Sequence, residues 1–198
     1  MQDEEACMSY IAHILEAVNA QLDAWYINDS EEDQRLPHHL EPKLYVPVQK
    51  LAELGLAHWV LDSNNYEHDM ELRKIRAERG YTYQDIVDIA PDLLPNYEAN
   101  LKNFYKEHMH ADEEIRFILA GSGYFDVRDF DDRWIRIWAK KNDMLVVPAG
   151  MYHRFTLDES EYIKALRLFK GYPVWTPHYR PQDEHPSRKD YITFWKRQ

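Results

Sequence analysis

The sequence predicts an α+β protein that is mostly β, in which several short helices precede an antiparallel β-barrel or sandwich. Short runs of β-branched and aromatic residues, separated by turn residues, recur after about residue 114. Apolar residues at helical spacing lie mostly before that point. Tyrosine and tryptophan are frequent, with 14 and 6 copies among 198 residues, and such large flat side chains favour strands.

The first half of the chain predicts helices joined by loops. Apolar side chains between Tyr10 and Leu22 share one face of a helix, which we treat as an N-terminal extension (residues 1–23) of a single domain (residues 24–198). A helix over residues 70–79 should end at Gly80, because glycine adopts the left-handed geometry of a helix end. The other predicted elements, in chain order, are a surface loop at 29–43, a helix at 48–56, a strand at 58–61, a helix at 82–89 capped by Thr82, and a helix from Asn96 towards Lys106.

The second half predicts short strands and tight turns. Glycine, proline, asparagine and aspartate punctuate the apolar runs and mark the places where the chain reverses. The predicted strands are 114–119, 124–128, 134–139, 144–147, 152–157 and 164–169, and the predicted turns are 121–123, 129–132, 140–143 and 148–150.

Composition and charge narrow the classes of function. The net charge of −11 would repel a phosphate backbone, so nucleic acid is not an expected partner. The single cysteine, Cys7, excludes a disulfide within the chain and fits a reducing compartment. No apolar run approaches the length of a membrane span, and the acidic N-terminus has none of the features of a secretion signal. We therefore expect a cytoplasmic protein without membrane insertion.

A cluster of metal-ligand residues lies where the strands begin. Because residues two apart on a strand point to the same side, His108 and His110 can direct both imidazoles into one cavity. Glu114 shares this parity if the strand continues, and His153 would come from a distant strand. Three imidazoles and one carboxylate suit Fe(II), Ni(II), Mn(II), Zn(II) or Cu(II) and leave coordination positions open for a substrate.

The wider pattern distinguishes this cluster from ordinary histidines. A His-x-His pair alone is common and usually belongs to the surface or the core. Here His-x-His-x3-Glu-x6-Gly ends at Gly121, and Pro-x-Gly-x2-His follows with Pro148 and Gly150 at a predicted turn. The chain therefore predicts a mononuclear catalytic metal site.

These two blocks resemble the paired motifs of the cupin superfamily, a small β-barrel of the jelly-roll type. The longer stretches His-Met-His-Ala-Asp-Glu-Glu-Ile-Arg-Phe-Ile-Leu, Gly-Ser-Gly-Tyr-Phe-Asp-Val-Arg-Asp and Pro-Ala-Gly-Met-Tyr-His-Arg-Phe resemble the acireductone dioxygenase family. So do Ala-Trp-Tyr from residue 24, Leu-Pro-Asn-Tyr-Glu from residue 94 and Pro-Val-Trp-Thr from residue 173. The resemblance covers the chain from about Ala24 to its end.

Three positions depart from the general cupin pattern. Lys102 and Asn142 stand where the two motifs usually have glycine, and Leu157 stands where the second motif usually ends in asparagine. None of the three is a metal ligand in the superfamily. Asparagine tolerates left-handed turn geometry, so residue 142 should still permit the turn.

The resemblance implies a dioxygenase of methionine salvage that acts on 1,2-dihydroxy-3-keto-5-methylthiopentene, with one Fe(II) or Ni(II) per chain. In this family the iron form gives formate and 4-methylthio-2-oxobutanoate. The nickel form gives carbon monoxide, formate and 3-methylthiopropanoate. The expected small-molecule partners are the acireductone and dioxygen, and the implied ligands are His108, His110, Glu114 and His153.

Other side chains have both a functional and a structural interpretation. Arg116 shares strand parity with Glu114 and, by the resemblance, could steady negative charge on the substrate; it could equally pair with a barrel acid. Phe104, Phe155 and Trp175 could line a pocket for the methylthio tail or simply pack in the core. Arg154 and Asp126 are expected to be structural. His38, His39, His178 and His185 are expected to be solvated loop residues, and His13, His58 and His68 have no supporting pattern.

Two alternatives remain open at this point. Another metal cupin, such as a quercetin-type dioxygenase or a sugar isomerase, would share the four ligands but not the surrounding motifs. A non-catalytic cupin would serve as a binding module. By family resemblance alone we expect a monomer, with the nucleus as a second location and a protein as a second kind of partner.

Overall fold

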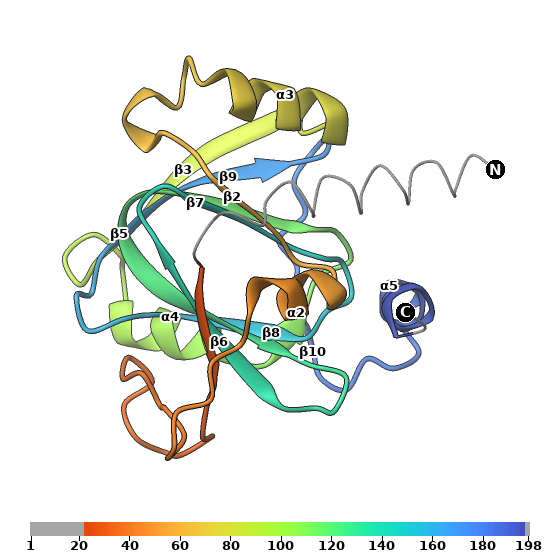
Figure 1. The fold of residues 1–198 in the computed structure, drawn as a ribbon. Coiled ribbons are helices and arrows are strands. Elements are labelled where there is room, and N and C mark those ends of the chain that lie inside the picture. Colours follow the sequence, from red (N-terminus) through yellow and green to blue (C-terminus); the bar gives the residue numbers. More distant parts are fainter. Residues whose placement is uncertain (1–21, 197–198) are drawn as a thin grey trace.

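Two antiparallel sheets face each other in the computed structural model, which describes residues 22–196 (Figure 1). The strands are β1 (Asp23–Tyr26), β2 (Ala57–Val60), β3 (Tyr83–Ile89), β4 (His108–Met109), β5 (Glu114–Arg128), β6 (Trp134–Lys140), β7 (Asp143–Val147), β8 (His153–Leu157), β9 (Ile163–Phe169) and β10 (His178–Tyr179). The helices are α2 (Val48–Glu53), the short 3₁₀ helix η2 (Ser63–Asn65), α3 (Met70–Arg79), α4 (Tyr97–Phe104) and α5 (Pro186–Trp195). This architecture confirms the predicted cupin class.

Strand β5 belongs to both sheets and joins them. Its first half pairs with β7 and β9, and its second half pairs with β6 and β8. The remaining strands extend each side, so one sheet has the order β1-β6-β5-β8-β4-β10 and the other the order β2-β7-β5-β9-β3. The largest apolar cluster contains residues of both sheets, including Ile118, Phe125 and Leu145.

The predicted turn at residues 121–123 is wrong, because β5 runs through it without reversing. The pairing register of β5 shifts between Ile118 and Ala120, and Gly121 then has a φ of 69°. A Cβ atom at Gly121 would lie 2.1 Å from the Tyr162 carbonyl oxygen, so only glycine fits. The bulge and the glycine bend the strand from one sheet into the other.

The predicted helix at residues 82–89 is also wrong, since this segment is strand β3. It pairs with β9 over seven consecutive residues, from Tyr83 to Ile89. The Thr82 hydroxyl does not cap a helix but accepts a hydrogen bond from the Gly171 amide at 3.0 Å. The partner strand therefore overrides the local helical pattern.

The other predicted helices are confirmed with small changes at their ends. Helix α3 has the predicted bounds; the Asp69 side chain caps it by accepting from the Leu72 amide, and Gly80 ends it with a φ of 71°. Helices α2 and α4 occupy the segments predicted at residues 48–56 and 96–106. Within the second motif, Asn142 has a φ of 83°, as its substitution for glycine requires.

The sequence missed structure at both ends of the domain. Helix α5 was not predicted; His185, expected in a loop, accepts at its N-terminus from the Ser187 amide, and Tyr191 and Trp195 are buried. Asp23 and Ala24 belong to strand β1, not to a helix. Leu22 is buried and not helical, residues 1–21 lie outside the described part of the chain, and the division at residue 23 stays a prediction.

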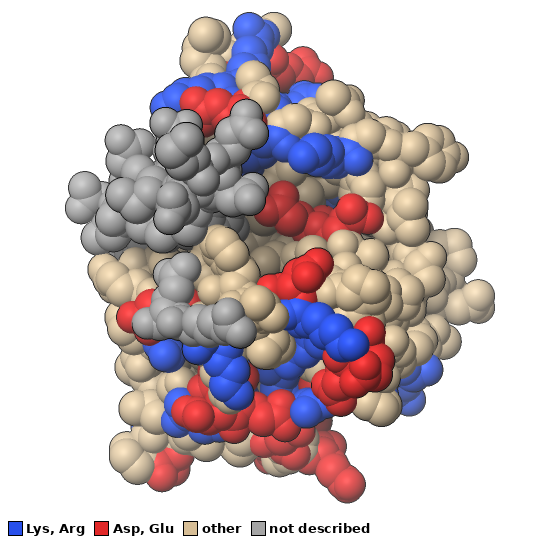
Figure 2. All heavy atoms as spheres, turned by 90° about the vertical axis from the view of Figure 1, so that its right-hand side faces the viewer, with Lys and Arg blue, Asp and Glu red and all other residues tan. Residues whose placement is uncertain are grey.

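Charged side chains of both signs share the surface on the face that carries α5. Figure 2 shows Asp and Glu side chains around a hollow on this face, with Lys and Arg side chains close by. No helix within residues 22–196 combines the length and the apolarity that a membrane crossing requires.

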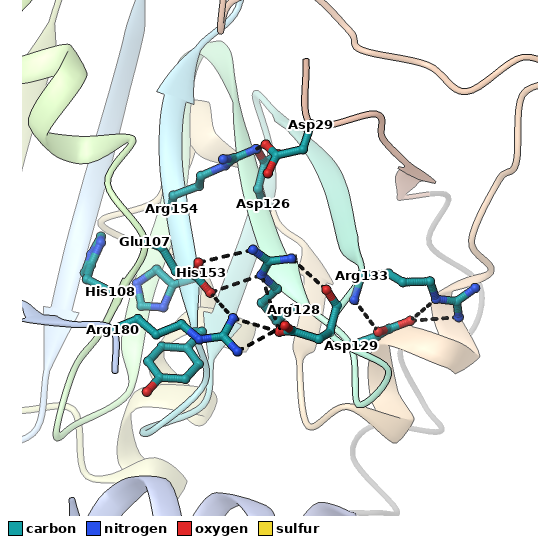
Figure 3. Close-up of polar contacts among 12 residues, drawn as sticks. Asp29, Glu107, His108, Asp126, Arg128, Asp129, Arg133, His153, Arg154 and Arg180 are labelled. Carbon is teal, nitrogen blue, oxygen red and sulfur yellow. Dashed lines mark hydrogen bonds and ion pairs between the residues drawn. The ribbon is translucent and has the colours of Figure 1, made fainter. Parts of the chain in front are cut away.

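One charge pair is enclosed under the loop that follows β1. Arg136 and Asp126 are 0% and 1% exposed, and the guanidinium donates to both carboxylate oxygens at 2.7 and 2.8 Å. Arg154 donates to the same carboxylate at 2.9 Å and to Asp29 at 3.0 Å (Figure 3). The structural role expected for Arg154 and Asp126 agrees with this arrangement.

Replacing Asp126 with alanine should therefore lower the free energy of unfolding by about 3–5 kcal/mol, because it leaves Arg136 buried without its partner. Urea unfolding measures the change. Asp131→Ala is the control: this carboxylate is 80% exposed and lies 3.5 Å from Arg133, so its loss should cost less than about 1 kcal/mol. Equal effects of the two substitutions would contradict the assignment.

Candidate metal centre

The four predicted ligands meet at one end of the barrel, although three strands and the loop after β4 supply them. His108 and His153 are direct partners on the neighbouring strands β4 and β8. One ring nitrogen from each of His108, His110 and His153 lies within 4.8 Å of the other two. The Glu114 Oε2 atom lies 3.4 Å from His110 Nε2 and 3.9 Å from His153 Nε2.

Glu114 reaches this cluster by a different route from the one predicted. Strand β4 ends at Met109, and the chain leaves the sheet before it enters β5 at Glu114. Strand parity therefore does not connect His108 with Glu114. The carboxylate is positioned by β5, whose residue 114 pairs with Val147 of β7.

Backbone carbonyl groups fix the tautomer of all three imidazoles. The Nδ1 atoms of His108, His110 and His153 lie 2.7, 3.0 and 2.9 Å from the carbonyl oxygens of Lys106, Thr176 and Met151. Because a carbonyl can only accept, each Nδ1 carries the proton, and each neutral ring presents an Nε2 lone pair to the cluster. Such second contacts are typical of metal-binding histidines.

The donor atoms fit a metal ion. His153 Nε2 is buried and has no hydrogen-bond partner within the described part of the chain, which would be costly for a purely structural histidine. Three imidazole nitrogens and one carboxylate oxygen are donors that divalent transition metals accept. His108, His110, Glu114 and His153 could therefore hold one ion together.

The electrostatics favour the metal-binding protonation states of His153, His108 and Glu114, but not of His110. Burial lowers the pKa of His153 to about 3, so the ring is neutral. Burial also lowers the pKa of His108. Burial alone would raise the pKa of the Glu114 carboxyl, but the charge of Arg116 and the hydrogen bond with His110 hold it well below its usual range. At His110, burial would lower the pKa of the ring, but the hydrogen bond and the charge of Glu114 outweigh burial and raise it.

A cavity of about 350 Å³ opens beside the ligands. The aromatic residues predicted for the substrate pocket, Phe104, Phe155 and Trp175, all line it. The ring of Phe155 lies 6.3 Å from that of Phe104 and 5.0 Å from that of Phe125. Three of the proposed ligands, His108, His110 and Glu114, line the same space together with Arg116.

Arg116 combines both of its predicted roles. It donates to Glu114 Oε2 at 3.0 Å, so it is paired with a barrel acid, and it also lines the cavity. Its guanidinium carbon lies 5.6 Å from the centre of the Trp175 ring. A cation thus stands next to both the carboxylate and the space for a ligand.

Sequence reasoning missed three groups at the site. Arg167 lines the cavity opposite Arg116 in the β5–β9 pairing and forms an ion pair with Asp85 of β3. Tyr179 borders the cavity from β10. The Thr176 carbonyl orients His110. The only available signal for Arg167 was the parity that it shares with Ile163 and Ala165 on β9. Nothing in the local sequence marks a backbone carbonyl as a contact of a distant histidine.

The remaining histidines are less solvated than predicted. His38 is 5% exposed, and its Nε2 atom lies 2.9 Å from the Asp33 carbonyl oxygen, because the loop folds back over the sheet. The rings of His178 and His185 are half-buried and tilted to each other, with centroids 4.6 Å apart. The expectation of a solvated ring was wrong for His38.

Four further histidines lie away from the cavity or outside the described residues. His39 is half-buried, with its ring centroid 4.6 Å from that of Trp25. His58 is buried, and its Nε2 atom is hydrogen-bonded to Asp143 Oδ1 at 2.7 Å. His68 is exposed, and His13 lies outside the described residues.

Comparison with known proteins gives one consistent family. The model of the ARD/ARD' family matches residues 23–177. Acireductone dioxygenase 3 of Physcomitrium patens is 64% identical over 178 residues, which cover 90% of this chain and 88% of the relative. Acireductone dioxygenase 4 of Arabidopsis thaliana is 63% identical over 171 residues, which cover 86% of this chain and 91% of the relative.

A solved structure agrees with the fold. An acireductone dioxygenase from Bacillus anthracis with a cadmium ion in its active centre matches with a TM-score of 0.63 at 24% identity. The match covers 81% of this chain and 99% of that one. It supports the cupin arrangement of strands.

Removing one ligand should abolish metal binding without unfolding the barrel. We expect His153→Gln to retain less than about a tenth of the metal of the unaltered protein. Loss of a residue that binds the metal directly should lower the metal affinity at least as much as the roughly 10–100-fold that is typical for residues that contact a ligand. Elemental analysis after dialysis measures it. His68→Gln, an exposed histidine remote from the cavity, is the control and should bind normally. Normal metal content in His153→Gln would rule out the proposed ligand set.

Proposed function

Because the chain belongs to the ARD/ARD' family and shares its acireductone dioxygenase function, we propose that its single metal centre is formed by His108, His110, Glu114 and His153 and holds Fe(II) or Ni(II). The observation that carries this proposal is the convergence of three Nε2 lone pairs and one carboxylate beside an apolar cavity. One ion per chain satisfies all four donors at once.

The substrate and the site are complementary in shape and charge. An ionised acireductone has a polar enediolate at one end and an apolar methylthio tail at the other. The cavity wall offers both kinds of group: the polar ligands and Arg116, and the apolar rings of Phe104 and Phe155. A divalent ion with one carboxylate leaves one net positive charge, which favours an anionic chelating group.

The residues of this chain have separate tasks in the proposed reaction with dioxygen. When bound, the ion would supply Lewis-acid chemistry and a template for the enediolate oxygens. Arg116 would stabilise negative charge that develops on the substrate. The aromatic walls would exclude water and hold the tail, and the carbonyl contacts at Nδ1 keep the imidazoles in one orientation.

The bound metal should select the products. We expect iron-loaded protein to release formate and 4-methylthio-2-oxobutanoate. Nickel-loaded protein should release carbon monoxide, formate and 3-methylthiopropanoate, because a different chelation of the enediolate would expose different carbons to dioxygen. Metal-free protein reconstituted with each ion, followed by product identification under air, is the test. Identical products from the two forms would refute the proposal.

Arg116→Met should reduce kcat/KM by about a hundredfold while the metal content stays near normal, because the methionine cannot stabilise substrate charge. Steady-state kinetics and elemental analysis on the same sample measure both quantities. Arg79→Met is the matched control. Arg79 pairs at 3.2 Å with Glu113, the residue before the proposed ligand Glu114, and is not part of the cavity wall. Unchanged turnover in Arg116→Met would remove this residue from the reaction.

We also propose that the protein acts as a monomer in the cytoplasm, with the nucleus as a second location. Family resemblance supports this, as it supports a protein partner. Light scattering of the purified protein and fractionation of cells test the assembly and the location separately.

A further inference from the structure

Residues 170–180, which we call the C-terminal strap, close one side of the cavity. Trp175, Pro177 and Tyr179 all line the cavity. The carbonyl oxygen of Thr176 lies 3.0 Å from His110 Nδ1 and so orients a proposed metal ligand. The position of the strap therefore decides both the shape of the cavity and the direction of one imidazole.

Little packing holds the strap in place. Tyr172 and Val174 are 90% and 52% exposed, and a Cβ added at Gly171 would meet no atom within 4 Å. Strand β10 has two residues and pairs with the two-residue strand β4. Trp175 is the strap's apolar anchor, with its ring centroid 5.4 Å from that of Phe169.

The Arg180 side chain adds a charged contact between the far end of the strap and the domain. The Arg180 guanidinium donates to Glu107 at 2.8 Å and to both carboxylate oxygens of Asp132 at 2.8 and 3.0 Å (Figure 3). Its carbon atom also lies 5.0 Å from the centre of the Tyr152 ring. Asp132 belongs to the β5–β6 turn, so Arg180 connects the strap with a rigid hairpin.

Glu107 links this contact to the metal centre. It directly precedes His108, and its carboxylate also accepts from Arg128 at 3.0 and 3.2 Å. Two carboxylates and two guanidinium groups thus form a closed network, drawn with dashed lines in Figure 3. The network joins the strand that carries His108 to the strap that orients His110.

We propose that Arg180 is a positioning residue that holds the C-terminal strap against strand β4 and thereby keeps the Thr176 carbonyl on His110. The inference rests on the metal centre proposed above. The contacts are partly exposed, so salt should weaken them. The strap would then open more often, and the metal would leave more readily.

Two measurements on Arg180→Met test this proposal. Hydrogen exchange of the metal-free protein should become faster in amides 171–180 and stay unchanged in the core strands. Metal release from the loaded protein to an excess of chelator should become about tenfold faster, as for other outer contacts of metal ligands. Raising the salt concentration should speed release in the unaltered protein and have much less effect in Arg180→Met.

Matched variants separate the strap contact from general loss of surface charge. Arg133→Met removes an ion pair with Asp129 in the same turn, at 2.8 Å and without contact to the strap, and should leave exchange and release unchanged (Figure 3). Arg180→Lys keeps a positive charge and should restore most of the slow release. Asp132→Asn should act like Arg180→Met, because it removes the charge that pairs with Arg180. Asparagine tolerates the φ of 62° at this position, so the turn itself should be kept.

Each outcome has a distinct meaning. Unchanged strap exchange in Arg180→Met overturns the contact itself. Faster exchange with unchanged metal release overturns its effect on His110, and an equal effect of Arg133→Met overturns its specificity. Failure of the unaltered protein to bind metal would refute the proposed metal centre instead, while the exchange experiment would still decide the role of Arg180 in holding the strap.

Discussion

Hydrogen bonds from three histidine Nδ1 atoms to backbone carbonyls are the constraint on which the site depends. They force the Nε2 lone pairs of His108, His110 and His153 towards one point beside Glu114. Lone pairs gathered in a buried space repel one another unless a cation or a proton joins them. The fold therefore has to bring β4, β5 and β8 together and keep their ends rigid. The bend of β5 at Gly121 makes this possible, because the strand then pairs with β7 at Glu114 and with β8 at Val127, which lies opposite His153.

Charge is distributed so that the buried carboxylates of Glu114 and Asp126 have defined partners. Glu114 contacts Arg116 and two imidazoles, and its carboxyl stays ionised although it is buried. On the other side of the sheet, Asp126 is enclosed between Arg136 and Arg154. The first cluster leaves a cation next to an apolar cavity, which suits an anionic head and an apolar tail. The second cluster is fully internal and gives the loop after β1 a fixed position.

The segments that follow β9 brace the site from outside the sheets. The strap supplies the Thr176 carbonyl, and α5 contacts both ligand loops through Ser187 on the Ala111 carbonyl and Arg188 on the Gly150 carbonyl, at 3.1 and 3.0 Å. A Cβ atom at Gly150 would lie 2.1 Å from the Ser187 carbonyl oxygen. The glycine of the second motif therefore permits close docking of α5 as well as a turn. The Gly150 amide also donates to the His110 carbonyl at 3.0 Å, which couples the two motifs.

The sequence by itself determined the ligand types, the fold class and most strands, because these depend on side-chain chemistry and spacing within short stretches. The cluster of His108, His110, Glu114 and His153 and the helix at residues 70–79 are examples. Only the tertiary structure decided that residues 83–89 form a strand, since their partner β9 lies far along the chain. The same holds for the continuity of β5 and for the contact between Thr176 and His110. Backbone pairing between distant segments leaves no mark on local sequence, so it is settled only when the two sheets close around the site.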